Sequence, residues 1–179
     1  MASLVSFSFP RLDTERLLLR ELRPDDFEGY FAHMSDGDLR KYCGGALNRR
    51  EAWRMFLVSA GSWLVTRSGW WLAEERATGA VVGMVGAFFR ETSLGRGRDA
   101  DLELGWSTYR EAWNRKLARE AATAALAWAI EAHDPKRVIA HIDKANLASI
   151  AVARALGMQH SGTVDFYGEP SELFVIDRR

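Results

Sequence analysis

The sequence has little cysteine and no excess of charge of either sign. Cys43 is the only cysteine, which excludes a disulfide framework and a cysteine-based metal cluster. Lys and Arg together number 24, as do Asp and Glu, so the formal net charge is zero. Nonspecific nucleic-acid binding draws on a net basic face. We therefore expect no nucleic-acid partner, although a local basic patch could still attract a small polyanion.

Long apolar runs are also missing. The longest, "AVVGMVGAFF" and "AATAALAWAI", fall well short of the about 20 residues that a membrane-spanning helix needs. The opening "MASLVSFSFPRL" lacks the basic start and long apolar core of a signal peptide. With 47% hydrophobic and 27% charged residues, the composition is that of a globular chain. We expect a cytoplasmic protein that does not contact membranes.

Several motifs that would define a function directly are absent. The sequence contains no Walker-type phosphate loop, no G-x-G-x-x-G after a strand and no H-E-x-x-H zinc helix. The four histidines are scattered along the chain. No metal site is therefore predicted.

The periodicity of apolar residues predicts the order β-α-α-β-β-β-α-β-α-β-β. Strands are expected at 14–22, 69–75, 79–91, 99–107, 136–143, 162–168 and 171–178. Helices are expected at 23–36, 48–65, 115–133 and 146–157. No repeat or linker interrupts this order, so residues 1–179 are predicted to form one α/β (α+β) domain. Its sheet should be mixed and mostly antiparallel, with about seven strands flanked by helices.

Periodicity also predicts which helix faces point inward. In the first helix Phe27, Tyr30, Phe31 and Met34 share one face. In the second helix Trp53, Phe56 and Leu57 are expected to face the core. In the third helix the inward set is Leu117, Ala121, Ala124 and Trp128.

Three segments of the second half predict an anion-binding edge. "DLELGW" is a strand on which Asp101 and Glu103 point the same way. "WNRKLAREA" then opens a helix, and "NLASIAVARALG" opens another after the next strand. A β-α-β unit places both helix starts at one edge of the sheet, where free N–H groups favour an anion. The first of these helix starts carries several cations but no glycine.

The order and spacing of these motifs resemble the GNAT N-acetyltransferase superfamily. The similar branch includes the ribosomal-protein N-terminal alanine and serine acetyltransferases, with E-x-G-Y/W, W-G-x-G-Y-A-T-E-A and N-x-x-S…L-G-F. This chain has "LELGW", "WNRKLAREA" and "NLASIAVARALGM", and its opening "TERLLLRELRPDD" is similar to T-x-R-L-x-L-R-x-x-x-x-x-D. The resemblance runs from about Leu12 to Arg178 and implies a single GNAT-like domain.

The resemblance implies transfer of an acetyl group from acetyl-CoA to a primary amine by direct attack on the thioester. The acceptor would be a protein N-terminus or a small amine, and a homodimer is possible. One alternative is a catalytically weak module that binds coenzyme A or a partner without turnover, because loop glycines are missing and Ala153 replaces the tyrosine of many members. Another is a structural domain whose helix starts bind nothing.

The resemblance also assigns two candidate catalytic residues. Glu103 occupies the place of the family's strand carboxylate and would take the proton of the amine; alternatively, it pairs with an arginine across the sheet. Ser149 would hydrogen-bond the thioester sulfur, or satisfy N–H groups at a helix start. Asn146 is either a plain N-cap or a contact of the pantetheine arm.

The remaining cofactor contacts follow from the same resemblance. Backbone groups of the strand after Glu103 would bind the pantetheine amides, and the N–H groups of the next loop would surround the pyrophosphate. Asn114 replaces a glycine and tolerates a left-handed conformation; Lys116 is tolerated only if its φ is negative and its side chain points away. The predicted cofactor-binding residues are Trp106, Ser107, Thr108, Asn114, Arg115, Lys116, Leu117, Ala118, Arg119, Asn146 and Ser149.

The resemblance implies that the acceptor site is built from the first two helices and the final β-hairpin. Among the aromatic residues of the chain, Tyr30, Trp71 and Tyr167 are our candidate substrate contacts. Most aromatic side chains at such spacings belong to the core instead. The identity of the acceptor does not follow from them.

Overall fold

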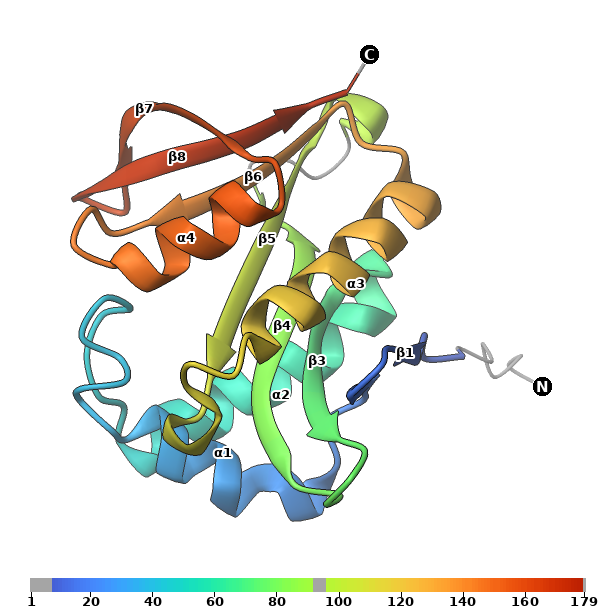
Figure 1. The fold of residues 1–179 in the computed structure, drawn as a ribbon, viewed down its shortest axis with the longest axis vertical. Coiled ribbons are helices and arrows are strands. Elements are labelled where there is room, and N and C mark those ends of the chain that lie inside the picture. Colours follow the sequence, from blue (N-terminus) through green and yellow to red (C-terminus); the bar gives the residue numbers. More distant parts are fainter. Residues whose placement is uncertain (1–7, 92–95, 179) are drawn as a thin grey trace.

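The protein, seen in a computed structural model that describes residues 8–91 and 96–178, is built on an eight-stranded sheet of order β1-β2-β3-β4-β5-β6-β8-β7 (Figure 1). The strands are β1 (Leu12–Asp13), β2 (Leu17–Arg20), β3 (Gly69–Glu75), β4 (Val81–Phe89), β5 (Asp101–Thr108), β6 (Arg137–Ile142), β7 (Gln159–Phe166) and β8 (Glu169–Asp177). The helices are α1 (Phe27–Met34), α2 (Arg49–Thr66), α3 (Leu117–His133) and α4 (Leu147–Ala155). The predicted fold class is confirmed, and the two-residue β1 adds an eighth strand.

The sheet changes character between β5 and β6. From β2 to β5 each strand pairs antiparallel with the next, as the prediction of a mostly antiparallel sheet requires. β5 and β6 pair in parallel from Asp101 opposite Arg137 to Glu103 opposite Ile139. The described pairing ends there, and in Figure 1 β6 and β8 turn away from the lower part of β5. The last five residues of β5 thus form an open wedge with the second half of the sheet.

Helices cover both faces of the sheet. α3 lies on β4 and β5, where Ala121, Ala122 and Ala125 are buried against Leu102 and Leu104. Their small side chains let the helix axis approach the strands closely. On the other face, α1 and α2 enclose a second cluster with β3 and β4: Phe27, Tyr30, Met34, Ala52, Phe56, Leu72 and Met84. None of the helices in the described ranges is both long and apolar enough to cross a membrane.

The inward face of α2 differs from the prediction. Its buried residues are Ala52, Phe56, Ser59 and Trp63, whereas Trp53 and Leu57 are 42% and 49% exposed. The prediction of Trp53 and Leu57 as core residues is therefore wrong. Apolar side chains occur on both sides of this helix, so the hydrophobic pattern did not determine which side packs on the sheet.

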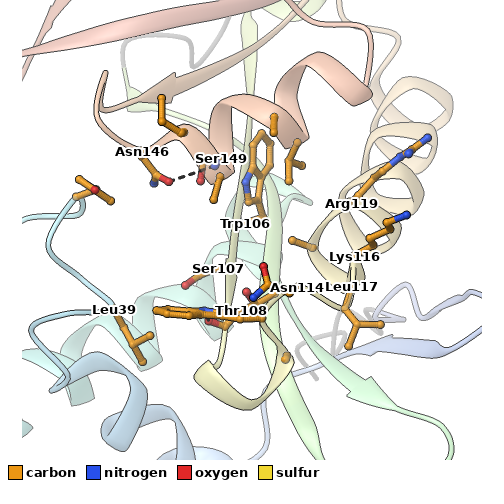
Figure 2. A pocket seen from close by; sticks show the side chains of 18 of the residues that line it. Leu39, Trp106, Ser107, Thr108, Asn114, Lys116, Leu117, Arg119, Asn146 and Ser149 are labelled. Atoms are coloured by element: carbon orange, nitrogen blue, oxygen red, sulfur yellow. Dashed lines mark hydrogen bonds between the residues drawn. The ribbon is translucent and has the colours of Figure 1, made fainter.

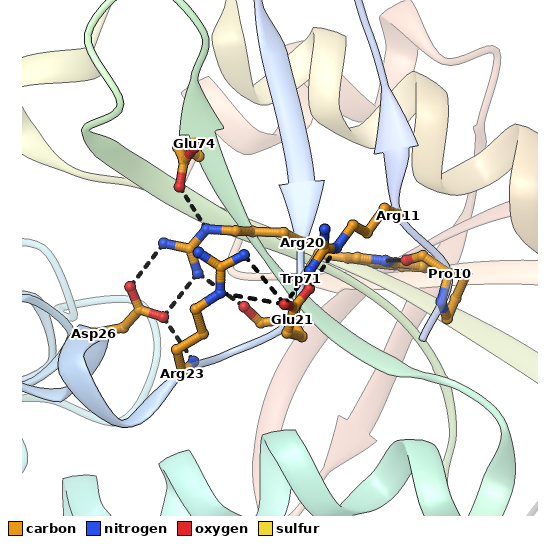
Figure 3. Close-up of polar contacts among 8 residues, drawn as sticks. All are labelled: Pro10, Arg11, Arg20, Glu21, Arg23, Asp26, Trp71 and Glu74. Atoms are coloured by element: carbon orange, nitrogen blue, oxygen red, sulfur yellow. Dashed lines mark hydrogen bonds and ion pairs between the residues drawn. The ribbon is translucent and has the colours of Figure 1, made fainter. Parts of the chain in front are cut away.

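A buried arginine fixes the start of α1 to the sheet (Figure 3). Arg20 on β2 is only 4% exposed, and its guanidinium donates to both carboxylate oxygens of Asp26 at 2.8 Å and to Glu74 at 2.5 Å. Asp26 also accepts the backbone N–H of Arg23 at 2.7 Å. A buried charge requires such pairing, because an unpaired ion is costly in the interior. The network holds α1 against β2 and β3, and so positions the α1 residues that reach β5.

Candidate active site

A cleft of about 810 Å³ opens where β5 leaves β6. Its walls are the end of β5, the start of α3, the start of α4 and the segment 38–43 (Figure 2). Sites for small molecules and cofactors typically have volumes of about 300 to 1,000 Å³. The cleft is therefore large enough for a substantial organic ligand, and it brings together the motifs that the sequence placed at one edge of the sheet.

The start of α3 leaves its backbone N–H groups open. The first backbone hydrogen bond runs from Glu120 N–H to Lys116 O at 3.2 Å, so helix geometry provides no acceptor for the N–H groups of Leu117, Ala118 and Arg119. Lys116, the N-cap residue, provides no side-chain cap. These open groups and the helix dipole together favour an anionic ligand.

Two left-handed residues shape this helix start. Asn114 has φ of 60° and Lys116 has φ of 61°. Asn114 adopts the left-handed conformation that asparagine tolerates, whereas the condition of a negative φ at Lys116 is not met. Because a side chain in this conformation costs about 1–2 kcal/mol relative to glycine, the turn at Lys116 is strained.

The cations of this segment point to two different places. Lys116 and Arg119 line the cleft on its α3 side (Figure 2). Arg115 does not line it: its guanidinium pairs with Glu75, at the end of β3. The predicted cofactor contact of the Arg115 side chain is therefore not supported, because a half-buried carboxylate on a neighbouring strand holds it. Ala118 and Leu117 lie at the cleft wall between the cations.

The start of α4 faces α3 across the cleft and is capped. The Asn146 side-chain oxygen accepts the Ser149 N–H at 3.1 Å, and both side chains line the cleft (Figure 2). The N-cap prediction for Asn146 is confirmed. Its amide nitrogen and the Ser149 hydroxyl are separate polar groups at the same wall, so a cofactor contact is compatible with the cap.

Between the two helix starts, the end of β5 forms the floor of the cleft. Trp106, Ser107 and Thr108 all line it, as predicted. Because the pairing with β6 ends at Glu103, the backbone groups of Trp106 and the N–H of Thr108, which point to that side, are available to a ligand. Trp113 also lines the cleft, with 44% of its surface exposed and its indole N–H donating to Thr108 O at 3.3 Å. The sequence analysis had assigned no role to Trp113.

Glu103 forms an ion pair with an arginine. This was the alternative to its predicted role as the base that takes the proton of the amine. Glu103 is 6% exposed, and the Arg90 guanidinium donates to both carboxylate oxygens, from Nε to Oε2 and from Nη2 to Oε1 at 2.7 Å. Glu103 is not among the residues that line the cleft. Since both carboxylate oxygens are occupied by the guanidinium and the residue does not reach the cleft, this geometry does not support a proton-accepting role.

Two of the three predicted acceptor contacts are core residues. Tyr30 and Trp71 are both 0% exposed, Tyr30 beneath Phe56 and Trp71 beneath Trp63. Neither side chain can touch an acceptor in this structure, so these two assignments are wrong. Tyr167, by contrast, is 68% exposed at the turn between β7 and β8, and its hydroxyl accepts from Arg90 Nη1 at 3.3 Å. It lies outside the cleft lining.

A histidine missed by the sequence analysis contacts the floor of the cleft from below. His33 on α1 is 4% exposed, and its Nε2 lies 2.8 Å from the Ser107 Oγ. Its ring stacks on Tyr109 with 4.5 Å between the ring centroids. Helical spacing from Tyr30 could have placed His33 on the buried face, but nothing in the sequence indicated its partner on β5.

The imidazole of His33 is uncharged at neutral pH. Burial and, with smaller effect, the charge of Arg40 lower the pKa of His33 to about 4. Asp36 and Glu111 act in the opposite direction with smaller effect. A buried histidine next to a cation loses the charged form because neither the solvent nor a close carboxylate stabilises it.

The fold and the cleft define the class of the protein. An uncapped, cationic helix start and a splayed parallel strand pair form a site for an elongated anionic ligand, and no group of three potential metal-binding side chains occurs among the described residues. Residues 16–159 match the model of the Acetyltransferase (GNAT) domain family. The chain belongs to this family, and acetyl-CoA is its co-substrate.

Relatives extend over nearly the whole chain. An uncharacterized N-acetyltransferase of Bacillus subtilis, YoaA, is 27% identical over 161 residues, covering 89% of this chain and 88% of its own. The crystal structure of an acetyltransferase from Agrobacterium tumefaciens superposes with a TM-score of 0.83 at 26% identity, covering 99% of this chain and 100% of that one. The ribosomal α-N-protein acetyltransferase RimL, solved in complex with coenzyme A, shares the fold with a TM-score of 0.76 at 12% identity over 94% and 98% of the chains.

Proposed function

We propose that the protein is an acetyl-CoA-dependent N-acetyltransferase that moves the acetyl group to a primary amine by direct attack on the thioester. The acceptor is a protein N-terminus or a small amine. The observation that carries this proposal is the open start of α3, which faces the capped start of α4 across the unpaired end of β5. An acyl-CoA has a matching order of parts: phosphates, an amide-bearing arm and a thioester.

The phosphates would lie at the start of α3. There the N–H groups of Leu117, Ala118 and Arg119, which no helix carbonyl accepts, would donate to the phosphates, and Asn114 lines the same wall of the cleft. Lys116 and Arg119 add two positive charges at the same wall. Charge-assisted hydrogen bonds of Arg and Lys with phosphate are stronger than neutral ones, so these side chains offset part of the close fit that glycine would give.

The pantetheine arm would lie along the unpaired end of β5. On the side that β6 leaves unpaired, the backbone groups of Trp106 and the N–H of Thr108 are available to its amides. This placement brings the thioester between the end of β5 and the start of α4, where Asn146 and Ser149 lie. Binding along an unpaired strand edge supplies main-chain hydrogen bonds without requiring particular side chains.

The reaction needs an uncharged amine and a stabilised leaving group. The amine nitrogen forms a bond with the acetyl carbon, and the carbonyl electron pair moves to oxygen. When this intermediate collapses, the carbon–sulfur bond breaks and the electron pair leaves with the sulfur, while the amine proton passes to water in the cleft. The Ser149 hydroxyl would donate a hydrogen bond to the departing thiolate, a role that its position at the cleft wall supports.

A second function is favoured by the ion pair of Glu103. Because Arg90 holds both carboxylate oxygens and Ala153 stands where many family members have a tyrosine, the chain has neither the free carboxylate nor the phenol of those members. A module that binds coenzyme A without turnover would have these features. Both functions require binding of coenzyme A, so only a measurement of turnover distinguishes the enzyme from the binding module.

Thiol release from acetyl-CoA tests the proposal. We expect release with at least one member of a panel of peptides starting with Ala, Ser or Met, together with spermidine, and an acetylated product of matching amount by mass spectrometry. Ser149→Ala should lower kcat with little change in acetyl-CoA affinity. Binding of acetyl-CoA without thiol release from any amine would contradict the proposal and leave the binding module as the function.

A further inference from the structure

The floor of the cleft contains a polar pair whose role the proposed function does not use. Ser107 lines the cleft, and from the opposite side its Oγ is 2.8 Å from His33 Nε2. His33 itself is buried by α1, β5 and the stacked ring of Tyr109. The inference that follows rests on the proposed acetyl transfer, because it concerns the same cleft.

The surroundings of His33 determine which ring nitrogen carries the proton. Its Nδ1 is buried and has no hydrogen-bond partner among the described residues, whereas Nε2 contacts Ser107. A buried N–H without an acceptor is rarer in proteins than an under-used acceptor atom. The proton of the neutral ring therefore belongs on Nε2, where the Ser107 oxygen accepts it, and the bare lone pair belongs on Nδ1.

This tautomer fixes the direction of the serine hydroxyl. When Oγ accepts the imidazole N–H, the hydroxyl proton cannot point at His33 and is free to donate elsewhere. Ser107 is the member of the pair that lines the cleft, so the donor direction that remains open is the one toward the ligand. A fixed donor costs no reorganisation when charge develops on its acceptor.

We propose that His33 donates its Nε2–H to Ser107 and thereby turns the Ser107 hydroxyl into the cleft, where it hydrogen-bonds the acetyl oxygen of the thioester and the oxyanion formed by amine attack. No proton is transferred in this step: the carbonyl electron pair moves to oxygen, and the hydroxyl shares its hydrogen with that oxygen. Ser107 is then a catalytic residue, and His33 is a positioning residue that acts through it.

The charges around His33 are consistent with a positioning role. Arg40 disfavours the imidazolium, while Asp36 and Glu111 favour it more weakly, and Asp36 is itself paired with Arg110 at 2.8 Å. The net effect and the burial lower the pKa of His33 well below neutral pH, so the ring keeps one proton over the working range. A ring this reluctant to accept a second proton is a poor general base but a constant hydrogen-bond donor.

Variants at the two positions test the inference, with the peptide or spermidine probe that the wild type acetylates. Ser107→Ala should lower kcat about 100-fold, as the loss of one oxyanion donor does, while the dissociation constant of acetyl-CoA changes little. His33→Leu should lower kcat at least tenfold. His33→Gln should restore most of it, because the glutamine amide can donate to Ser107 but cannot take up a proton. His133→Leu, at a half-buried histidine outside the cleft, is the matched control and should leave kcat unchanged.

Three results would overturn the inference. These are an unchanged kcat in Ser107→Ala, a kcat in His33→Gln as low as that of His33→Leu, and imidazole nitrogen chemical shifts at pH 7 that place the proton on Nδ1. The chemical shifts need no acceptor, so they decide the tautomer even if the wild type releases no thiol. Absence of thiol release from the wild type would contradict the proposed function itself, and with it the catalytic role of Ser107.

Discussion

Two polar pairs lie on the same side of β5, and they differ in charge and in access. Glu103 and Ser107 are four residues apart on one strand, so their side chains point to the same face. Glu103 is bound at both oxygens by Arg90, and neither residue lines the cleft. Ser107 is bound by the uncharged His33 and does line it. The comparison teaches that the partner of a polar side chain, more than its residue type, determines whether it is available for chemistry.

The two pairs also depend on different physical terms. The Arg90–Glu103 pair compensates a buried carboxylate with a partly exposed guanidinium, which also lies 4.5 Å from the centroid of the Phe166 ring. The His33–Ser107 pair avoids charge altogether, because desolvation keeps the imidazole neutral. We therefore expect the free energy of unfolding to fall when one partner of the first pair is removed. The contribution of the second pair to this free energy should instead depend on pH.

The largest effect should follow from breaking the ion pair. Arg90→Met leaves the Glu103 carboxylate, whose side chain is 8% exposed, without its partner. We expect the free energy of unfolding to fall by about 3 kcal/mol in urea titrations. The double variant Arg90→Met/Glu103→Leu should regain most of this loss, because two apolar side chains need no pairing. A double variant as unstable as the single one would show that the ion pair is not the cause.

A smaller effect on stability should come from His33, and this effect should depend on pH. Its pKa is lowered from the unfolded value of about 6.5 to about 4, so between these values the unfolded chain binds a proton that the folded chain does not. Stability therefore falls as pH drops from 7 to 5, by about 2 kcal/mol for this group alone, and this contribution stops changing below pH 4.

His33→Gln should remove that share of the pH dependence. The measurement is the difference in unfolding free energy between wild type and His33→Gln at pH 7 and at pH 5, in which the contributions of the other titrating groups cancel. If the difference is the same at both pH values, His33 is not held neutral by burial.

The charge of the Lys116 side chain, which belongs to neither pair, should affect cofactor affinity and have little effect on stability. Lys116→Met removes one cation at the α3 start and keeps the left-handed backbone. We expect the dissociation constant of coenzyme A to rise about fivefold, equivalent to about 1 kcal/mol, with little change in stability. Isothermal titration calorimetry measures this directly. An unchanged affinity would mean that the Lys116 side chain does not contact phosphate.

The smallest effect should come from relieving strain at the same position. Lys116→Gly replaces a residue at φ of 61° by the one residue that adopts it freely. The relief is partly offset by the larger conformational freedom of glycine in the unfolded chain, so we expect a net stabilisation of about 0.5 kcal/mol in urea titrations. A loss of stability would indicate that Lys116 makes a contact that outweighs its backbone strain.

The order of elements could be predicted because it depends on local patterns. Strand and helix periodicities predicted the order of strands and helices and the buried face of α1, and Asn146 was recognisable as an N-cap from its place before an apolar run. The inward face of α2 could not be resolved, because Trp53 and Leu57 are as apolar as the residues that face the sheet. The local sequence pattern therefore predicts where a helix or strand lies more reliably than it predicts which face of that helix or strand is buried.

Partners distant in the chain could not be predicted at all. Arg115 and Glu75 are 40 residues apart, and His33 and Ser107 are 74 apart, yet each pair meets in the folded chain. Many arginines could have paired with Glu103, so the sequence left both its roles open. The positive φ of Lys116 escaped prediction for a related reason: the surrounding fold imposes it against the preference of the residue.

The melting temperature with and without saturating coenzyme A tests most directly that the cleft between α3 and α4 is the cofactor site. A ligand at 100 times its dissociation constant adds about 2.7 kcal/mol, which for a chain of this length raises the melting temperature by about 5–10 °C. We predict this increase for the wild type, and none for Ala118→Trp, in which an indole fills the cleft beside the open N–H groups of α3. No increase in the wild type, or the same increase in both proteins, would contradict the account.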